Sequence, residues 1–102
     1  MSVQIVRFRT DAAHAAELEE SIGRVLAALA DAAPAGVSYT AVRARESPEF
    51  LLMLALEEGI ANPLPELPEA AALRTLIAQR AGGPVPPVAM QVIGEYRAGE
   101  AR

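Results

Sequence analysis

His14 is the only histidine of the chain and the side chain best suited to transfer a proton near neutral pH. It lies four residues before Leu18, so a helix through this stretch would place both on one face. There His14 could act as a general base toward a phenol or an enol, and the dipole of the helix N-terminus favours its neutral form. The alternative is a half-exposed histidine at a helix end, held by a neighbour and without a chemical role.

Arg7 and Arg43 could each bind an anionic oxygen, because each follows apolar residues on its own face of a predicted strand. On this interpretation Arg43 would take part in catalysis and Arg7 in substrate binding. The competing interpretation places both at the rim of a sheet, paired with Glu46, Glu57 or Glu95.

Two tyrosines and a methionine could line an apolar pocket. Tyr39 and Tyr96 each combine an apolar ring with a hydroxyl that could face a substrate, or each could be an amphipathic strand residue. Met53 lies in a nearly continuous apolar stretch, where its thioether suits either the core or an adaptable pocket. One histidine, no cysteine and no spaced cluster of acidic residues leave a metal site without support, and we expect no cofactor.

The spacing of the apolar residues predicts the helices and strands that must position these side chains. A helix is predicted from Asp11 to Ala33, with a continuous apolar stripe, and a shorter one from Pro68 to about Ala81. The stripe consists of Leu18, Ile22, Val25, Leu26 and Leu29. Strands are predicted at 3–10, 37–46, 50–57 and 88–97. Three prolines within 58–68 predict a loop before the second helix.

The order β-α-β-β-α-β predicts an α+β, ferredoxin-like fold, with a four-stranded antiparallel sheet and two helices on one face. The stretch 50–57 is apolar on both sides, so the uncovered face of the sheet also needs a partner. We therefore expect a homodimer that packs sheet against sheet. The length of 102 residues fits a single domain, 1–102.

Composition narrows the classes of function. Hydrophobic residues make up 52% of the chain and charged residues 22%, which suits a globular domain better than a disordered chain or a membrane span. The net charge is −4 and the basic residues are scattered arginines, so nucleic-acid binding has no electrostatic support. The N-terminus lacks the apolar run of a signal peptide, and we expect a cytoplasmic protein.

The chain resembles the dimeric α/β-barrel superfamily, and within it the small proteins similar to antibiotic-biosynthesis monooxygenases. The resemblance rests on element order, on the stretch NPLPELPEAAALRTLIAQR and on the last predicted strand, MQVIGEYRA. It implies a dimer and a pocket between helices and sheet for an aromatic or polyketide-like molecule, oxidised without a cofactor. It also implies that Asn62 could fix a substrate carbonyl, although Asn-Pro is equally typical of a turn. The family pattern includes a tryptophan, which this chain lacks.

Two functional hypotheses follow. The first is a small monooxygenase or isomerase that works without a cofactor, with His14, Asn62 and Arg43 in catalysis. The second is a non-catalytic dimeric module that binds a small apolar or aromatic ligand, or that only assembles. Fold alone does not choose between them. An open, partly polar cavity between helices and sheet would favour the first, and a filled space the second.

Overall fold

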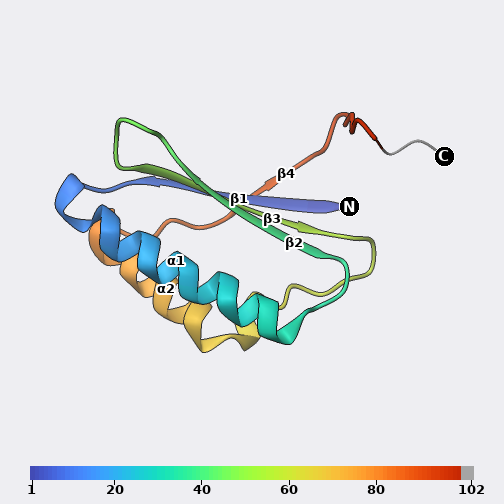
Figure 1. The fold of residues 1–102 in the computed structure, drawn as a ribbon, viewed down its shortest axis with the longest axis horizontal. Helices are drawn as coiled ribbons and strands as arrows, with labels where there is room; N and C mark the ends of the chain where they lie inside the picture. The colour runs from blue at the N-terminus through green and yellow to red at the C-terminus, as the bar shows by residue number, and fades with distance from the viewer. Residues whose placement is uncertain (100–102) are drawn as a thin grey trace.

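The computed structural model describes residues 1–99 of the chain. The strands are β1 (Ser2–Arg9), β2 (Val37–Arg43), β3 (Glu49–Leu56) and β4 (Val88–Met90), and the helices are α1 (Ala12–Ala32), the short 3-10 helix η1 (Leu64–Glu66) and α2 (Pro68–Arg80). Both long helices lie side by side on one face of the sheet, and the other face is open (Figure 1).

The sheet has the order β2-β3-β1-β4, and each neighbouring pair is antiparallel. This confirms the ferredoxin-like α+β fold. Phe8 is paired with Phe50 and Val6 with Leu52, and these residues pack toward the helices. Because side chains alternate along a strand, the residues between them point to the open face. By this alternation the open face carries Ile5, Arg7, Val42, Leu51, Met53, Val88 and Met90.

The core forms where the stripe of α1 meets β1 and β3. Leu18, Val25 and Phe50 have fully buried side chains. The rings of Phe8 and Phe50 stack with centroids 5.2 Å apart and planes 9° from parallel. Burial of each such side chain contributes roughly 1.5–3 kcal/mol, so this cluster is the main support for the position of α1.

Local signals set the helix boundaries. Asp11 is the N-cap of α1, and its Oδ1 accepts the backbone N–H of His14 at 3.0 Å. Ala33 ends that helix in the left-handed conformation, with φ of 47°. Pro68 occupies the first turn of α2, where its missing N–H costs nothing.

A close approach at Gly36 fixes the loop that follows β3. The φ of Gly36 is 75°, and an added Cβ would lie 2.7 Å from Cγ1 of Ile60. Glu57 donates its backbone N–H to the carbonyl of Gly36 at 2.9 Å, and Ile60 donates to the carbonyl of Glu57 at 3.0 Å. These contacts hold the loop against the start of β2, so that Asn62 and Tyr39 line the same space.

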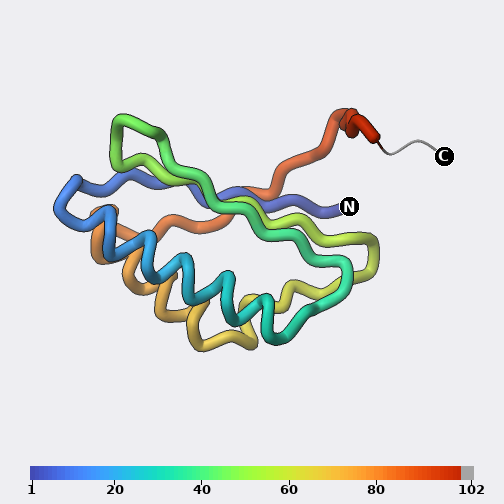
Figure 2. The backbone as a smooth tube through the Cα atoms, in the orientation of Figure 1, coloured from blue at the N-terminus to red at the C-terminus, as the bar shows by residue number. Residues whose placement is uncertain are grey.

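Three details of the predicted elements were wrong. The strand predicted over 37–46 ends at Arg43, before the turn that leads to β3. Leu26 is 41% exposed, because a step of about 100° from buried Val25 carries it past the edge of the stripe. The last strand was predicted over 88–97, but β4 ends at Met90. Met90 is paired with Val3 and β1 begins at Ser2, so residues 91–97 run past the end of β1 and pair with no strand among the residues that the structure describes. Figure 2 shows this segment leaving the sheet.

Candidate functional site

A cavity of about 140 Å³ lies between α2 and the helix-side face of the sheet. It is smaller than the roughly 300–1,000 Å³ of sites for drug-sized ligands. It is close to the ~150 Å³ at which an apolar protein cavity holds a benzene molecule. Its apolar walls are formed by Val6, Leu52, Leu54, Leu64, Pro65, Ala70, Leu73, Ile77, Val85 and Pro87. One aromatic ring therefore fits, and a longer ligand would extend through the open side.

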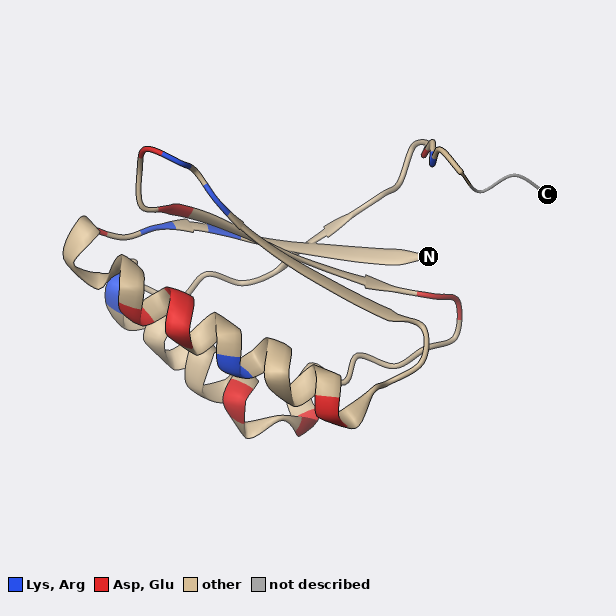
Figure 3. Ribbon diagram, in the orientation of Figure 1, with Lys and Arg blue, Asp and Glu red and all other residues tan. Residues whose placement is uncertain are grey.

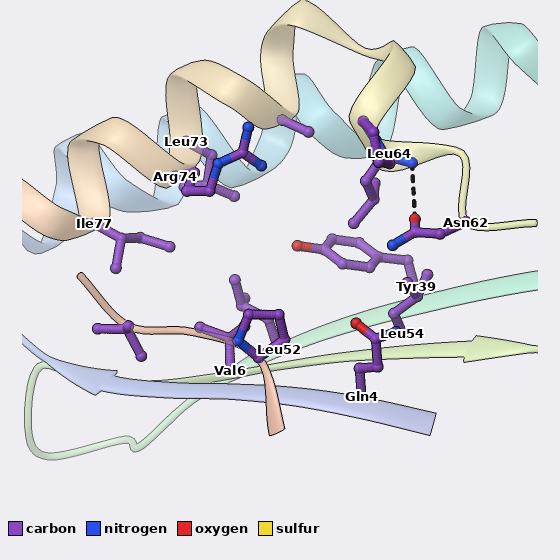
Figure 4. Close-up of a pocket in the computed structure, with 14 residues that line it drawn as sticks. Gln4, Val6, Tyr39, Leu52, Leu54, Asn62, Leu64, Leu73, Arg74 and Ile77 are labelled. Atoms are coloured by element: carbon purple, nitrogen blue, oxygen red, sulfur yellow. Dashed lines mark hydrogen bonds between the residues drawn. The ribbon is translucent and has the colours of Figure 1, made fainter. Parts of the chain in front are cut away.

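Four polar side chains from different elements share this lining: Gln4 of β1, Tyr39 of β2, Asn62 of the loop and Arg74 of α2. Figure 4 shows the Tyr39 hydroxyl pointing into the space between α2 and the sheet, with the amide of Gln4 below the Tyr39 side chain and that of Asn62 beside the ring. Oδ1 of Asn62 accepts the backbone N–H of Leu64 at 2.9 Å. This bond orients the amide and leaves its NH₂ group available to a ligand.

The burial of Tyr39 beside the cavity changes the pKa of its phenol. Burial raises the pKa of the Tyr39 phenol above its ordinary value, because the charged phenolate is poorly solvated there. The hydroxyl is therefore a neutral hydrogen-bond donor at physiological pH. Among the described residues no side chain accepts its proton, so a ligand oxygen in the cavity could do so.

Arg74 is the one charged residue among the described residues that line the cavity. Within residues 1–99 Arg74 makes no ion pair and no side-chain hydrogen bond. Arg80, six residues further along α2, instead pairs with Glu17 at 2.9 Å. The guanidinium of Arg74 lies against α2 at the helix side of the cavity (Figure 4), and the residue is exposed. An unpaired guanidinium beside an apolar wall suits an anionic or strongly polar oxygen on a flat ligand.

His14 lies at the opposite end of the helix layer and does not line the cavity. Its Nδ1 is 2.7 Å from Oδ1 of Asp11, the same carboxylate oxygen that caps α1. The geometry is that of a helix-end histidine held by its neighbour. No described contact connects it with Tyr39, Asn62 or the rest of the lining.

The predicted arginines also lie elsewhere. Arg7 points to the open face and its Nη2 is 3.2 Å from Glu49. Arg43 points to the helix side, where it pairs with Glu19 and lies over the ring of Phe50, 5.7 Å from its centroid. Figure 3 shows the arginines of β1 and β2 gathered at the end of the sheet near the β2–β3 turn. Both arginines have carboxylate partners, as the structural interpretation expected, although the partners are not the predicted ones.

The remaining two predicted residues are separated from the cavity as well. Met53 is on the open face of β3, and Tyr96 is 88% exposed in the segment after β4. Of the seven residues proposed from the sequence, the structure brings Tyr39 and Asn62 together in one lining.

The comparisons with known proteins add information on the fold. No protein-family model matches the chain, and no curated protein matches it. Among solved structures, Rv0793 from Mycobacterium tuberculosis aligns with a TM-score of 0.71 at 16% sequence identity, over 94% of this chain and 98% of that chain. At this identity the likeness shows a shared fold alone, in agreement with the ferredoxin-like arrangement described above.

Sequence reasoning did not single out Gln4 and Arg74. Gln4 lies on the helix-side face of β1 beside the apolar Val6 and Phe8, and the alternation of residues along the strand already placed it on that face. Arg74 follows buried Leu73 in α2, and no pattern in the sequence marks it as a binding residue. Its position beside the cavity depends on how α2 packs over the sheet. Within residues 1–99, no group of three or more His, Cys, Asp or Glu side chains could hold a metal ion. No helix in that range is long and apolar enough to cross a membrane.

Proposed function

We propose that this protein binds a flat aromatic molecule with at least one oxygen substituent, and that it oxidises such a molecule in the manner of the cofactor-independent monooxygenases. The observation that carries the proposal is the composition of the cavity lining. Apolar walls enclose space for one ring, while Tyr39, Asn62, Gln4 and Arg74 converge on it from four separate elements. A few convergent polar groups in an apolar pocket are typical of small-molecule sites.

Each polar group has a distinct part in recognition. The neutral Tyr39 hydroxyl and the amide NH₂ of Asn62 would donate hydrogen bonds to a phenolic or carbonyl oxygen of the ligand. Arg74 would favour the anionic form of that oxygen and so lower the pKa of a bound phenol or enol. The apolar walls would hold the ring by burial.

The reaction would begin with this enolate or phenolate. Loss of a proton from a CH₂ group conjugated to the ring leaves a carbanion, whose charge is shared with the oxygen near Arg74. The carbanion attacks O₂, so that a C–O bond forms and the O₂ is reduced to a peroxide. After protonation the hydroperoxide loses water and the former CH₂ becomes a carbonyl, with O₂ as the oxidant throughout. Among residues 1–99, no histidine or carboxylate lines the cavity, so the proton would leave to solvent and the protein would act by stabilising the anion.

The same absence of a general base favours a second candidate, a non-catalytic module that binds the same ligands. The volume of about 140 Å³ agrees with it, since a larger polyketide would enter by one ring only.

Calorimetry with phenol and quinol probes, together with oxygen-uptake assays on anthrone-type and quinol substrates, separates these candidates. Saturable binding with oxygen uptake above the rate without protein supports the monooxygenase. We expect Arg74→Gln to weaken binding by at least tenfold, since hydrogen bonds to charged groups contribute roughly 1.5–3 kcal/mol. Saturable binding without oxygen uptake supports the module. If none of the probes binds, both the monooxygenase and the binding module are wrong.

A further inference from the structure

A second hollow adjoins the cavity at the C-terminal end of α1. It is an open groove of about 300 Å³ between the last two turns of that helix and the start of β2. Apart from Tyr39, the described residues that line the groove are all apolar: Leu26, Leu29, Ala30, Ala33, Pro34 and Val37. Leu26 is 41% exposed. The groove therefore presents apolar surface to water directly beside the candidate site.

Tyr39 is the one residue, among those that the structure describes, that lines both the groove and the cavity. Its side chain therefore forms part of the wall between the two spaces. Figure 4 shows the Tyr39 ring toward the end of the cavity that lies away from Ile77, below Leu64 and beside Asn62. The position of this one side chain thus decides whether the cavity ends there or continues into the groove.

Packing alone holds the Tyr39 ring in its present position. Within residues 1–99 no side chain or backbone group makes a hydrogen bond with the Tyr39 hydroxyl. β2 is an edge strand, since the order of the sheet is β2-β3-β1-β4, so no further strand of this sheet lies beyond Tyr39. A change of χ1 from one staggered rotamer to another moves the ring away from the wall. That movement breaks no hydrogen bond within the described part of the chain.

We propose that Tyr39 sets how many fused rings the site accepts. With the Tyr39 ring in its present position, the cavity takes one aromatic ring. With that ring turned aside, the cavity and the groove join, and the second ring of a fused aromatic molecule lies in the groove against Leu26 and Ala30. A flat apolar ring suits this groove, because none of its described lining residues is charged. The inference rests on the proposed function, since it places the remainder of a ligand whose first ring occupies the cavity.

Calorimetry with phenol and 2-naphthol, which differ by one fused ring, tests the role of Tyr39. Tyr39→Ala removes the ring from the wall, whereas Tyr39→Phe keeps the ring and removes only the hydroxyl. A single methylene group in an apolar pocket is worth roughly tenfold or more in discrimination. We therefore expect the ratio of the phenol Kd to the 2-naphthol Kd to rise at least about tenfold in Tyr39→Ala. In Tyr39→Phe both ligands lose the same hydrogen bond, so the ratio should equal that of the unaltered protein.

Ala30→Phe tests the groove without a change to Tyr39. Ala30 is exposed and lines the groove, so a phenylalanine there fills the groove and leaves the core intact. We expect the 2-naphthol Kd to rise by about tenfold, on the same scale of discrimination, and the phenol Kd to stay unchanged. Ala27→Phe is the matched control, because Ala27 is an exposed alanine of α1 that lines neither space. It should leave both dissociation constants unchanged.

The two ligands separate failure of this inference from failure of the proposed function. Saturable binding of phenol together with any of three results would overturn the inference alone: no binding of 2-naphthol, unchanged 2-naphthol binding in Ala30→Phe, or an equal change of the ratio in Tyr39→Ala and Tyr39→Phe. If neither ligand binds the unaltered protein, the proposed function is wrong as well. Circular dichroism checks the folding of each variant, and Ala30→Phe, altered at the surface, decides the question even if Tyr39→Ala does not fold.

Discussion

Replacement of Ala70 by leucine tests how much free space the cavity between α2 and the sheet offers. Ala70 lies on α2, is buried and lines the cavity. Leucine adds three carbon atoms, and complete burial of these would contribute up to ~2.4 kcal/mol at about 0.8 kcal/mol for each CH₂ group. Since one side of the cavity is open, we expect about half of that, roughly 1 kcal/mol of added stability. Alanine and leucine have similar helix propensities, so the helix itself contributes little to the change.

For a domain of this size, 1 kcal/mol corresponds to a rise in Tm of about 4–8 °C. Thermal unfolding followed by circular dichroism measures this directly. Ala15→Leu is the matched control: Ala15 is a buried alanine on α1 that does not line the cavity. There the added carbons meet a filled core, and we expect a loss of roughly 1–3 kcal/mol. If Ala70→Leu lowers Tm as much as Ala15→Leu does, the space between α2 and the sheet is already filled and the reasoning fails.

Three further predictions concern groups that position the site. The raised pKa of Tyr39 means that the folded chain holds this proton more tightly than the unfolded chain, so its contribution to stability is complete below pH 10.0, the ordinary value, and is lost as pH rises through the folded-state pKa. Alkaline denaturation should be shallower in Tyr39→Phe than in the unaltered protein, and an equally steep loss of stability in both would contradict this. Asp11→Ala should cost about 1 kcal/mol through loss of the N-cap of α1. Asp11→Asn should restore most of it, and equal losses for both would show that the cap bond is not the cause. Thr10→Val should cost roughly 1–2 kcal/mol in urea unfolding, because the buried Thr10 hydroxyl donates to the carbonyl of Arg80 at 3.0 Å, and a neutral result would mean that water replaces that bond.

The order of elements could be predicted from the sequence because each signal is local. The stripe of α1, the Asp11 cap and the Pro68 start of α2 act within one or two helical turns. The end of β4 could not be predicted in this way. It depends on where β1 begins, through the pairing of Val3 with Met90, which is set by register across the sheet.

The residues of the candidate site were also hard to predict from the sequence, because the site depends on contacts between distant parts of the chain. His14 and Arg43 are residue types suited to catalysis, but each is held by an acidic partner. His14 contacts Asp11, three residues before it, and Arg43 of β2 pairs with Glu19 of α1. Arg74 has no such partner within residues 1–99, and only the packing of α2 over the sheet places it beside Tyr39. A charged side chain becomes available to a ligand when the fold leaves it unpaired, and pairing is decided by tertiary structure.

A titration with phenol, followed residue by residue in ¹H–¹⁵N NMR spectra, tests the central claim most directly. We expect a saturable change confined to the cavity lining, largest at Tyr39, Asn62 and the second and third turns of α2, and weakened in both Arg74→Gln and Ala70→Leu. Changes that are not saturable, or that centre on the open face of the sheet around Met53, would contradict it.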